Sequence, residues 1–440
     1  MGDDNEKMSV VIVLGVLLLI LVLLMLLMCF AWERLHRRAK GKTFYTEVIR
    51  PRIEWFLQRT RRLKMHALSR PIRVTELENY IKDMERDSNY QYSLQFENLE
   101  DVGKDLPCLA GNQPENKCKN RYFNILPYDS NHVKLLADSP TESDYINASY
   151  VKGKSGANHY IATQGPLPCT QAHFWQMVWE QQVSIIIMLT KCKEKLKVKC
   201  EPYWPEGKAM EKYGDFVVTL LSEMQQSNWI VRSFIISNVD EGEREVRHFQ
   251  YMAWPDKGTP INSHMSGLVK FLQQTRLAAQ RSNKPILVHC SAGVGRTGTF
   301  IALDHVLSDL ESGNNNLDFM ALVAELRRYR TGMVQTEEQY AFIHTCTLEM
   351  WRQLQQTQND GQKENNLCSN DEMREEGESS NGTEDANDLS VPTIIIHPAS
   401  EETQLLATNE QTQVGDNPVL LDDDEGENEL STCNNSSQAE

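Results

Sequence analysis

The sequence predicts an α/β (α+β) domain with a mixed β-sheet flanked by helices. It also predicts one transmembrane helix before this domain and a disordered tail after it, and one observation supports each of these three parts. Helical and β-rich segments alternate between residues 71 and 354, which favours a mixed sheet covered by helices. An uncharged apolar run over residues 8–30 predicts one transmembrane helix before the domain. The acidic, polar composition after residue 354 predicts a disordered tail behind it.

The N-terminal run over residues 8–30 has no charged side chain and consists mostly of Leu, Val, Ile and Met. It is long enough to cross a hydrocarbon core of about 30 Å as a helix. A cleaved signal peptide would begin with basic residues, whereas residues 1–7 carry net negative charge. Five basic residues follow the run, so the positive-inside rule places the rest of the chain in the cytoplasm: Arg34, Arg37, Arg38, Lys40 and Lys42.

This orientation leaves only residues 1–7 outside, so we expect a single-pass protein of the plasma membrane without a large ectodomain. Disulfides are not expected in the reducing cytosol, and the cysteine spacing predicts no zinc site. No metal and no other cofactor is expected.

The basic juxtamembrane segment occupies residues 31–70. Its residues 33–66 hold eleven Lys/Arg against three Glu. A solvated linker is one interpretation. Directly below a membrane, however, such a segment is expected to bind anionic inner-leaflet lipid at about 1 kcal/mol per basic residue. Residues 49–63 could form an amphipathic helix.

The domain itself is predicted over residues 71–354. We predict helices over residues 77–84, 174–182, 265–279, 297–310, 319–328 and 337–353. We predict strands over residues 185–189, 216–222, 229–237, 245–251 and 286–288. About 280 residues are enough for one large core.

The tail, residues 355–440, is predicted to be disordered. From residue 353 onward the chain carries 21 Asp/Glu and two Lys/Arg, a net charge of −19, whereas the whole chain carries −16. The overall acidity therefore says nothing about the surface of the domain. The apolar island over residues 391–397 could dock a partner protein, and no nucleic-acid partner is expected.

Residues 286–298 carry the strongest chemical signal. An apolar strand ends at His289, and Cys290 and Arg296 stand six positions apart with Gly293 and Gly295 between them. Successive N–H groups from Ser291 to Arg296 could form an anion-binding nest at a helix N-terminus. A thiol held over such a nest is expected to ionise readily. We therefore predict a phosphate pocket around a nucleophilic cysteine, against the alternative of a small buried hydrophobe.

The sequence His-Cys-Ser-Ala-Gly-Val-Gly-Arg-Thr-Gly at residues 289–298 resembles the catalytic loop of the protein tyrosine phosphatases. Further motifs resemble the family in order and spacing: residues 119–122 with 127–129, 144–149, 160–166, Glu194 with 199–205, 254–256 and 335–340. The likeness covers residues 71–352. It implies the tyrosine phosphatase fold, with a highly twisted mixed sheet, and hydrolysis of phosphotyrosine in proteins.

The family mechanism implies a role for each matching residue. Cys290 would attack phosphorus and form a cysteinyl-phosphate. Arg296 would hold two phosphate oxygens, and Asp256 would act as general acid and then as general base. The resemblance implies four more catalytic roles or supports: Gln335 orients water, Thr297 hydrogen-bonds the sulfur, His289 tunes the thiol, and Glu194, with Lys199 nearby, holds Arg296.

Substrate binding is assigned by the same likeness. Tyr122 would form one wall of a pocket too deep for phosphoserine. The other expected binding residues are Asn124, Asp256, Ser291, Ala292, Gly293, Val294, Gly295, Arg296, Gln335 and Gln339. Within the family, residues 90–99 and 124–129 resemble receptor-type enzymes with a single catalytic domain, the vascular-endothelial phosphatase group.

Three features depart from that group: the expected lack of an ectodomain, Lys257 in place of the usual His, and a tail without tyrosine. Two alternative functions stay open. One is a phosphoinositide phosphatase on the same fold, and the other is a phosphotyrosine-binding scaffold. Cys290, Arg296 and Asp256 are all present, which argues against a catalytically inactive scaffold.

Overall fold

The structure is a computed structural model that describes residues 21–28, 68–137, 143–154, 158–238, 241–261, 263–280 and 284–375. The chain divides into two compact units, Met1–Gln355 and Gln356–Glu440. The fold described below belongs to the first unit.

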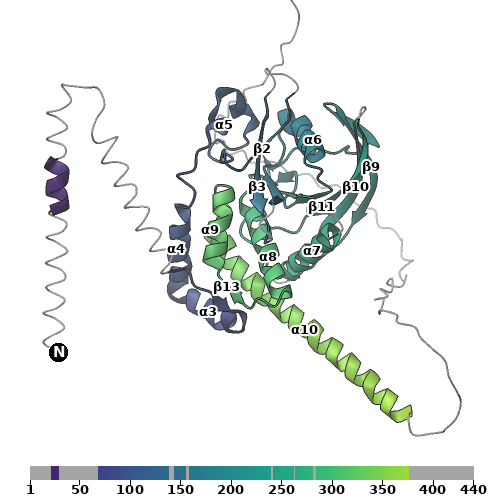
Figure 1. Ribbon diagram of the computed structural model, residues 1–440. Helices are drawn as coiled ribbons and strands as arrows, with labels where there is room; N and C mark the ends of the chain where they lie inside the picture. The colour runs from purple at the N-terminus through teal and green to yellow at the C-terminus, as the bar shows by residue number, and fades with distance from the viewer. Residues whose placement is uncertain are drawn as a thin grey trace, which may run out of the picture. The chain divides into compact units, whose positions relative to one another are not determined.

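A nine-stranded mixed sheet forms the centre of this unit (Figure 1). Its strand order is β2-β3-β4-β12-β5-β11-β10-β9-β8. The strands are β2 (His132–Lys134), β3 (Tyr145–Lys152), β4 (Asn158–Thr163), β5 (Ile185–Met188), β8 (Met210–Tyr213), β9 (Phe216–Gln225), β10 (Trp229–Asn238), β11 (Gly242–Tyr251) and β12 (Ile286–His289). Strands β4, β12, β5 and β11 run parallel, and the outer pairs are antiparallel.

Two small antiparallel strand pairs accompany the sheet. One joins β1 (Ile72–Arg73) to β13 (Asn316–Leu317), and the other joins β6 (Lys193–Glu194) to β7 (Lys197–Val198). The helices are α3 (Leu77–Met84), α4 (Arg86–Glu100), α5 (Leu109–Asn112), α6 (Gln171–Glu180), α7 (Ser263–Ala279), α8 (Gly295–Glu311), α9 (Phe319–Tyr329) and α10 (Glu337–Glu375). Short 3₁₀ turns cover Val74–Glu76, Pro114–Lys119 and Pro168–Thr170.

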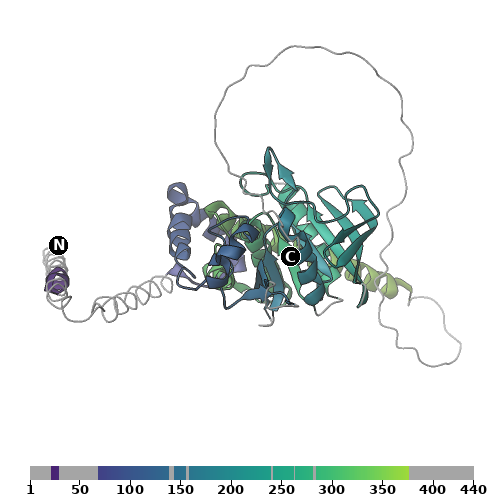
Figure 2. The same ribbon diagram turned by 90° about the horizontal axis from the view of Figure 1, so that it is seen from above.

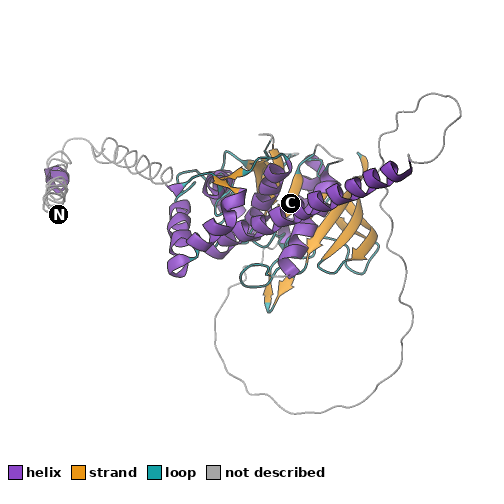
Figure 3. Cartoon of the chain, turned by 90° about the horizontal axis from the view of Figure 1, so that it is seen from below, coloured by secondary structure: helices purple, strands orange, loops and turns teal. Residues whose placement is uncertain are grey.

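The sheet separates two hydrophobic cores, because the side chains of its central strands alternate between the faces. Ile185 and Ile187 belong to the core under α7, α8 and α9, whereas Ile186 and Met188 belong to the core under α6. Figures 2 and 3 show the helices packed on the curved sheet from above and below. A strand buried on both faces reads as a continuous apolar run, as Ile185–Met188 does.

The predicted mixed α/β fold is confirmed, and most predicted elements are present with ends shifted by a few residues. Helix α10 is the exception, because it continues to Glu375, past the predicted end at residue 353 and into the segment predicted to be a disordered tail. The rest of that predicted tail, residues 376–440, lies outside the described residues. Strands β3 and β4 and helix α4 were not predicted. The sequence of β3, Tyr-Ile-Asn-Ala-Ser-Tyr-Val-Lys, mixes polar and apolar residues without the period of two, because most of it is buried on both faces.

The predicted membrane span, residues 8–30, lies largely outside the described residues, and only residues 21–28 of it are described, as helix. None of the helices in the described ranges combines the length and the apolar character needed to cross a bilayer. The proposed amphipathic helix over residues 49–63 and the island over residues 391–397 also lie outside the described residues.

Candidate active site

The site lies where the central strand β12 ends. Strand β12 has parallel neighbours on both sides, β4 and β5, and the chain leaves it at His289 to enter helix α8 at Gly295. In open α/β sheets, ligands bind beyond the carboxyl ends of the strands. Residues 290–294, called the phosphate loop below, therefore occupy the position at which such a fold places its site.

Every carbonyl oxygen of the phosphate loop accepts a hydrogen bond from the surrounding protein. The donors, from Cys290 to Val294 in order, are His289 Nδ1, Gly165 N, Arg330 Nη2, Arg330 Nε, and both Val334 N and Gly298 N. No hydrogen bond from the N–H groups of residues 291–295 to another described residue is present. A loop whose carbonyls are all occupied and whose N–H groups are not is suited to bind an anion.

Gly293 allows this loop to pass against strand β4. Its φ is +72°, and a Cβ placed there would lie 2.1 Å from the carbonyl oxygen of Thr163. Both the left-handed backbone and the missing side chain are therefore needed at this position.

Arg296 is fixed by a bidentate ion pair. Its Nη1 and Nη2 lie 2.5 and 3.0 Å from the two carboxylate oxygens of Glu194, whose side chain is 5% exposed. Arg296 also donates to the carbonyl oxygens of Leu189 (3.2 Å) and Pro255 (3.1 Å). The predicted pairing of Glu194 with Arg296 is present, and the guanidinium is held between the β6–β7 hairpin and the segment before Asp256.

Asp256 lies on an exposed loop after β11. Trp254, two residues before it, is buried and stands 5.8 Å from the Arg296 guanidinium. Lys195, at the turn of the β6–β7 hairpin, pairs with the Asp256 carboxylate at 3.2 Å. The hydrogen bond from Lys195 lowers the pKa of Asp256, and the nearby charge of Lys199 acts in the same direction.

The remaining predicted binding residues come from distant parts of the chain. The Tyr122 hydroxyl hydrogen-bonds Ser291 Oγ at 2.9 Å, which places the ring at the rim of the phosphate loop. A Cβ on Gly295 would lie 3.1 Å from Gln335 Oε1 and 3.0 Å from Gln339 Nε2, so both amides face the start of α8. Asn124 is exposed on the loop that carries Tyr122, and no hydrogen bond to its side chain occurs among the described residues.

Thr297 and His289 were both predicted to support the thiol, but only the side chain of His289 has hydrogen-bond partners among the described residues. The Thr297 hydroxyl is buried and has no hydrogen-bond partner in the described part of the chain, so its contact with the sulfur stays a prediction. His289 is buried, contacts the Tyr203 hydroxyl through Nε2 at 2.7 Å, and contacts the Cys290 carbonyl through Nδ1 at 3.1 Å. Burial lowers the pKa of His289 to about 4, so the imidazole is neutral near pH 7.

Arg330 is a site-supporting residue that the sequence did not reveal. It is fully buried, and besides the carbonyls of Ala292 and Gly293 it contacts Ser149 Oγ (3.2 Å) and Asn147 Oδ1 (2.7 Å). Burial lowers its pKa to about 10, so it remains a cation. A single arginine after a helix carries no signal in sequence, because its partners come from β3 and the phosphate loop.

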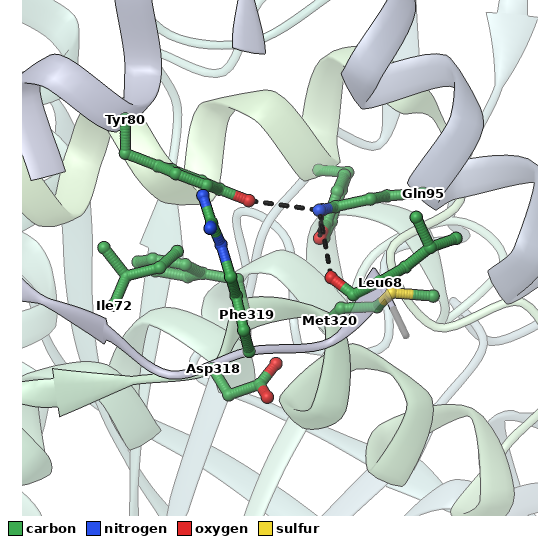
Figure 4. Close-up of a pocket in the computed structure, with 9 residues that line it drawn as sticks. Leu68, Ile72, Tyr80, Gln95, Asp318, Phe319 and Met320 are labelled. Atoms are coloured by element: carbon green, nitrogen blue, oxygen red, sulfur yellow. Dashed lines mark hydrogen bonds between the residues drawn. The ribbon is translucent and has the colours of Figure 1, made fainter. Parts of the chain in front are cut away.

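A separate pocket, shown in Figure 4, contains none of the predicted site residues. In it Gln95 donates to the Tyr80 hydroxyl (3.0 Å), and the Tyr340 hydroxyl donates to Gln95 (2.6 Å). These contacts join α3 and α4 to the first turn of α10, directly after Gln339. The pocket is therefore part of the support for the glutamine segment and not a second active site.

The fold and the site define the class of protein: a mixed α/β domain with an anion-binding loop at the carboxyl end of its central strand. Residues 116–349 match the profile of the Protein-tyrosine phosphatase family. The chain therefore belongs to the protein-tyrosine phosphatase family.

Named relatives agree with this family. The chain is 44% identical to human receptor-type tyrosine-protein phosphatase eta over 285 residues, which are 64% of this chain and 21% of that protein. It is 42% identical to the chicken protein of the same name over 293 residues, 66% of this chain and 21% of that protein. It is 38% identical to human phosphatidylinositol phosphatase PTPRQ over 360 residues, 80% of this chain and 15% of that protein. The chain thus spans about a fifth of the length of the first of these relatives.

Proposed function

We propose that this protein hydrolyses phosphotyrosine in proteins through a cysteinyl-phosphate intermediate. The observation that supports this most is the phosphate loop, whose carbonyls all accept hydrogen bonds, together with Arg296 at the start of the following helix, whose guanidinium is held by Glu194. The Cys290 thiolate would attack phosphorus, and the phenolic oxygen would leave. Loop N–H groups and Arg296 would stabilise the equatorial oxygens of the transition state.

Asp256 supplies the proton in this proposal. It would protonate the leaving oxygen in the first step and take a proton from water in the second, an effect worth about 10²–10⁴-fold. Gln335, with Gln339 beside it, would orient that water. Thr297 would hydrogen-bond the sulfur as the thiolate is released.

Tyr122 would select phosphotyrosine. Its ring stands at the rim of the phosphate loop and is 37% exposed, so it is available to stack against a substrate ring. Asn124 and Lys257, both exposed, would face the flanking peptide.

The mechanism has a direct test. The full chain should hydrolyse a phosphotyrosine peptide without added metal, and Cys290→Ser should abolish this activity. Asp256→Ala should retain substrate binding and enrich phosphotyrosine proteins from a lysate. Full activity of Cys290→Ser would rule out the proposed nucleophile, and failure of Asp256→Ala to retain any phosphotyrosine protein would argue against the proposed acid.

We further propose that the protein is a single-pass membrane protein with its phosphatase domain in the cytoplasm, of the single-domain, vascular-endothelial-like receptor type. The uncharged run over residues 8–30 and the basic residues after it support this placement. Deletion of residues 8–30 should release the protein from the membrane fraction. If it stays bound, the basic segment over residues 31–70 would be the anchor, through anionic lipid.

A phosphoinositide phosphatase is the second candidate. The 38% identity to phosphatidylinositol phosphatase PTPRQ favours testing it. The rates on a phosphotyrosine peptide and on vesicles containing phosphoinositides should be compared with the same preparation. A larger kcat/KM for the vesicles would favour the second candidate over the first.

A further inference from the structure

A buried chain of hydrogen bonds connects Arg232, far from the site in sequence, to both catalytic ends of the site. Arg232 lies in β10, is 5% exposed, and stacks over the ring of Trp204 at 4.6 Å. Its Nε pairs with Glu223 at 2.5 Å, and its Nη1 contacts Gln250 Oε1 (2.9 Å) and His248 Nδ1 (3.4 Å).

The first branch runs to the phosphate loop. His248 Nε2 contacts the Tyr203 hydroxyl at 2.8 Å, and the same hydroxyl contacts His289 Nε2 at 2.7 Å. His289 Nδ1 then contacts the carbonyl oxygen of Cys290. Burial lowers the pKa of both histidines and raises that of Tyr203, so all three groups are neutral near pH 7.

The direction of every bond in this branch can be derived from its loop end. A carbonyl oxygen only accepts, so His289 Nδ1 must carry the proton and His289 Nε2 must accept. The Tyr203 hydroxyl therefore donates to His289. The Tyr203 hydroxyl also lies 3.9 Å from Met188 Sδ, but a thioether sulfur is only a weak acceptor at this distance. The Tyr203 oxygen must then accept from His248 Nε2, which leaves His248 Nδ1 as an acceptor.

The Arg232 end of this branch requires the same arrangement of protons. A guanidinium has donors only and keeps its proton in proteins. His248 Nδ1 faces this donor, so it must be the unprotonated nitrogen. The two ends were assigned independently, and they agree on one arrangement of protons.

The second branch runs to Arg296. Because Arg232 donates to Gln250 Oε1, the Gln250 Nε2 group is free to donate to the carbonyl oxygen of Thr190 (3.1 Å). The Thr190 hydroxyl lies 3.0 Å from Glu194 Oε1, the oxygen that also holds Arg296 Nη1, and 3.0 Å from the carbonyl oxygen of Lys191, so its single proton is shared between these two acceptors. The same guanidinium thus orders the support of both the nucleophile loop and the phosphate-binding arginine.

We propose that Arg232 is a positioning residue that, together with the Cys290 carbonyl at the opposite end of the branch, fixes the tautomers of His248 and His289 and thereby supports the orientation of the Cys290 carbonyl and of Glu194. His289 would be held as the Nδ1–H tautomer, so that its bond to Cys290 O keeps that carbonyl turned away from the anion. Arg232 touches neither substrate nor reacting atoms in this proposal.

The test uses full-length protein labelled with ¹⁵N-histidine, in which imidazole nitrogen shifts identify each tautomer. His248→Gln and His289→Gln spectra assign the signals. In the unmodified protein, His289 should be protonated at Nδ1 and His248 at Nε2. A His289 protonated at Nε2 would overturn the proposal; the tautomers are read in the unmodified protein, and the two variants serve only to assign its signals.

Arg232→Met should then leave both histidines in a mixture of tautomers. Because the loop would be less well ordered, kcat should fall about 10-fold while KM changes little. Arg244→Met is the matched control. Arg244 also stacks on a tryptophan, Trp179, at 3.8 Å and donates to a carbonyl, but it lies outside the chain of bonds.

A folded Arg232→Met protein with unchanged tautomers would contradict the proposal. So would a kcat loss no larger than that of Arg244→Met. The kcat readout rests on the proposed phosphatase activity, whereas the tautomer readout does not. Absence of activity in the unmodified protein would therefore count against the proposed function and leave the tautomer result to decide the role of Arg232.

Discussion

Lys195 and Asp256 form an ion pair of 3.2 Å that connects the turn of the β6–β7 hairpin to the proposed acid loop. Lys195 has a left-handed backbone (φ 53°), which directs the turn of this two-stranded hairpin. The hairpin thus has two contacts with the site from successive residues, since Glu194 binds Arg296 and Lys195 binds Asp256.

Lys195→Ala should shift the pH dependence of catalysis. Lys195 lowers the pKa of Asp256, so its removal raises that pKa and keeps the acid protonated to higher pH. Because the proposed acid works in its protonated form, the alkaline limb of kcat/KM should move upward in pH. Lys197→Ala, an exposed lysine on the same hairpin, should leave the limb in place. If the alkaline limb of kcat/KM stays at the same pH in Lys195→Ala, then Lys195 does not influence the protonation of the proposed acid during catalysis.

Glu194→Gln should impair phosphate binding without loss of the fold. The amide keeps the size of the side chain but removes the charge that holds both Arg296 nitrogens. A misplaced guanidinium should lower kcat/KM by about 10²-fold. Kinetics and thermal melting should be measured together, with Glu201→Gln as a control that has no contact with Arg296. Near-normal kcat/KM in Glu194→Gln would show that Arg296 is positioned by its carbonyl contacts alone.

Arg330→Met should weaken anion binding and reduce stability. The change leaves the carbonyls of Ala292 and Gly293 and the side chain of Asn147 without a buried donor, at about 1–3 kcal/mol for each unsatisfied group. The inhibition constant for vanadate should rise about 10-fold as the loop carbonyls lose their orientation. Arg276→Met removes a partly buried ion pair with Asp304 away from the loop and should lower stability only. Equal vanadate inhibition in the two variants would argue against a role of Arg330 in loop orientation.

Tyr122 variants should separate ring stacking from hydrogen bonding. Tyr122→Phe loses only the bond to Ser291 and should retain most activity. Tyr122→Ala loses the ring, and kcat/KM for a phosphotyrosine peptide should fall about 10- to 100-fold. The much lower rate on a matched phosphoserine peptide should be unaffected by either change. A similar loss for both peptides in Tyr122→Ala would mean that the ring supports the loop and does not select the substrate.

Much of the fold was accessible from sequence because its signals are local. The apolar runs of β5 and β12, the periodicity of α3 and α9, and the glycines of residues 290–298 each predict a structure without reference to the rest of the chain. Strands β3 and β4 were missed, because their burial on both faces depends on neighbours supplied by the sheet. The pair Glu194–Arg296 was expected from the family resemblance, whereas the Tyr122–Ser291 hydrogen bond was not expected, and only the folded chain provided both distances.

By itself, the sequence determined which residues are proposed for the chemistry: a cysteine and an arginine on a glycine-containing loop, with an acid and two glutamines in fixed order. The tertiary structure alone decided how that loop is held. Arg330 meets Gly293 from 37 positions away and Ser149 from 181, and Arg232 lies 16 positions from its partner His248. Such contacts leave no local pattern, because a buried arginine is defined by the acceptors that surround it and not by its neighbours in the chain.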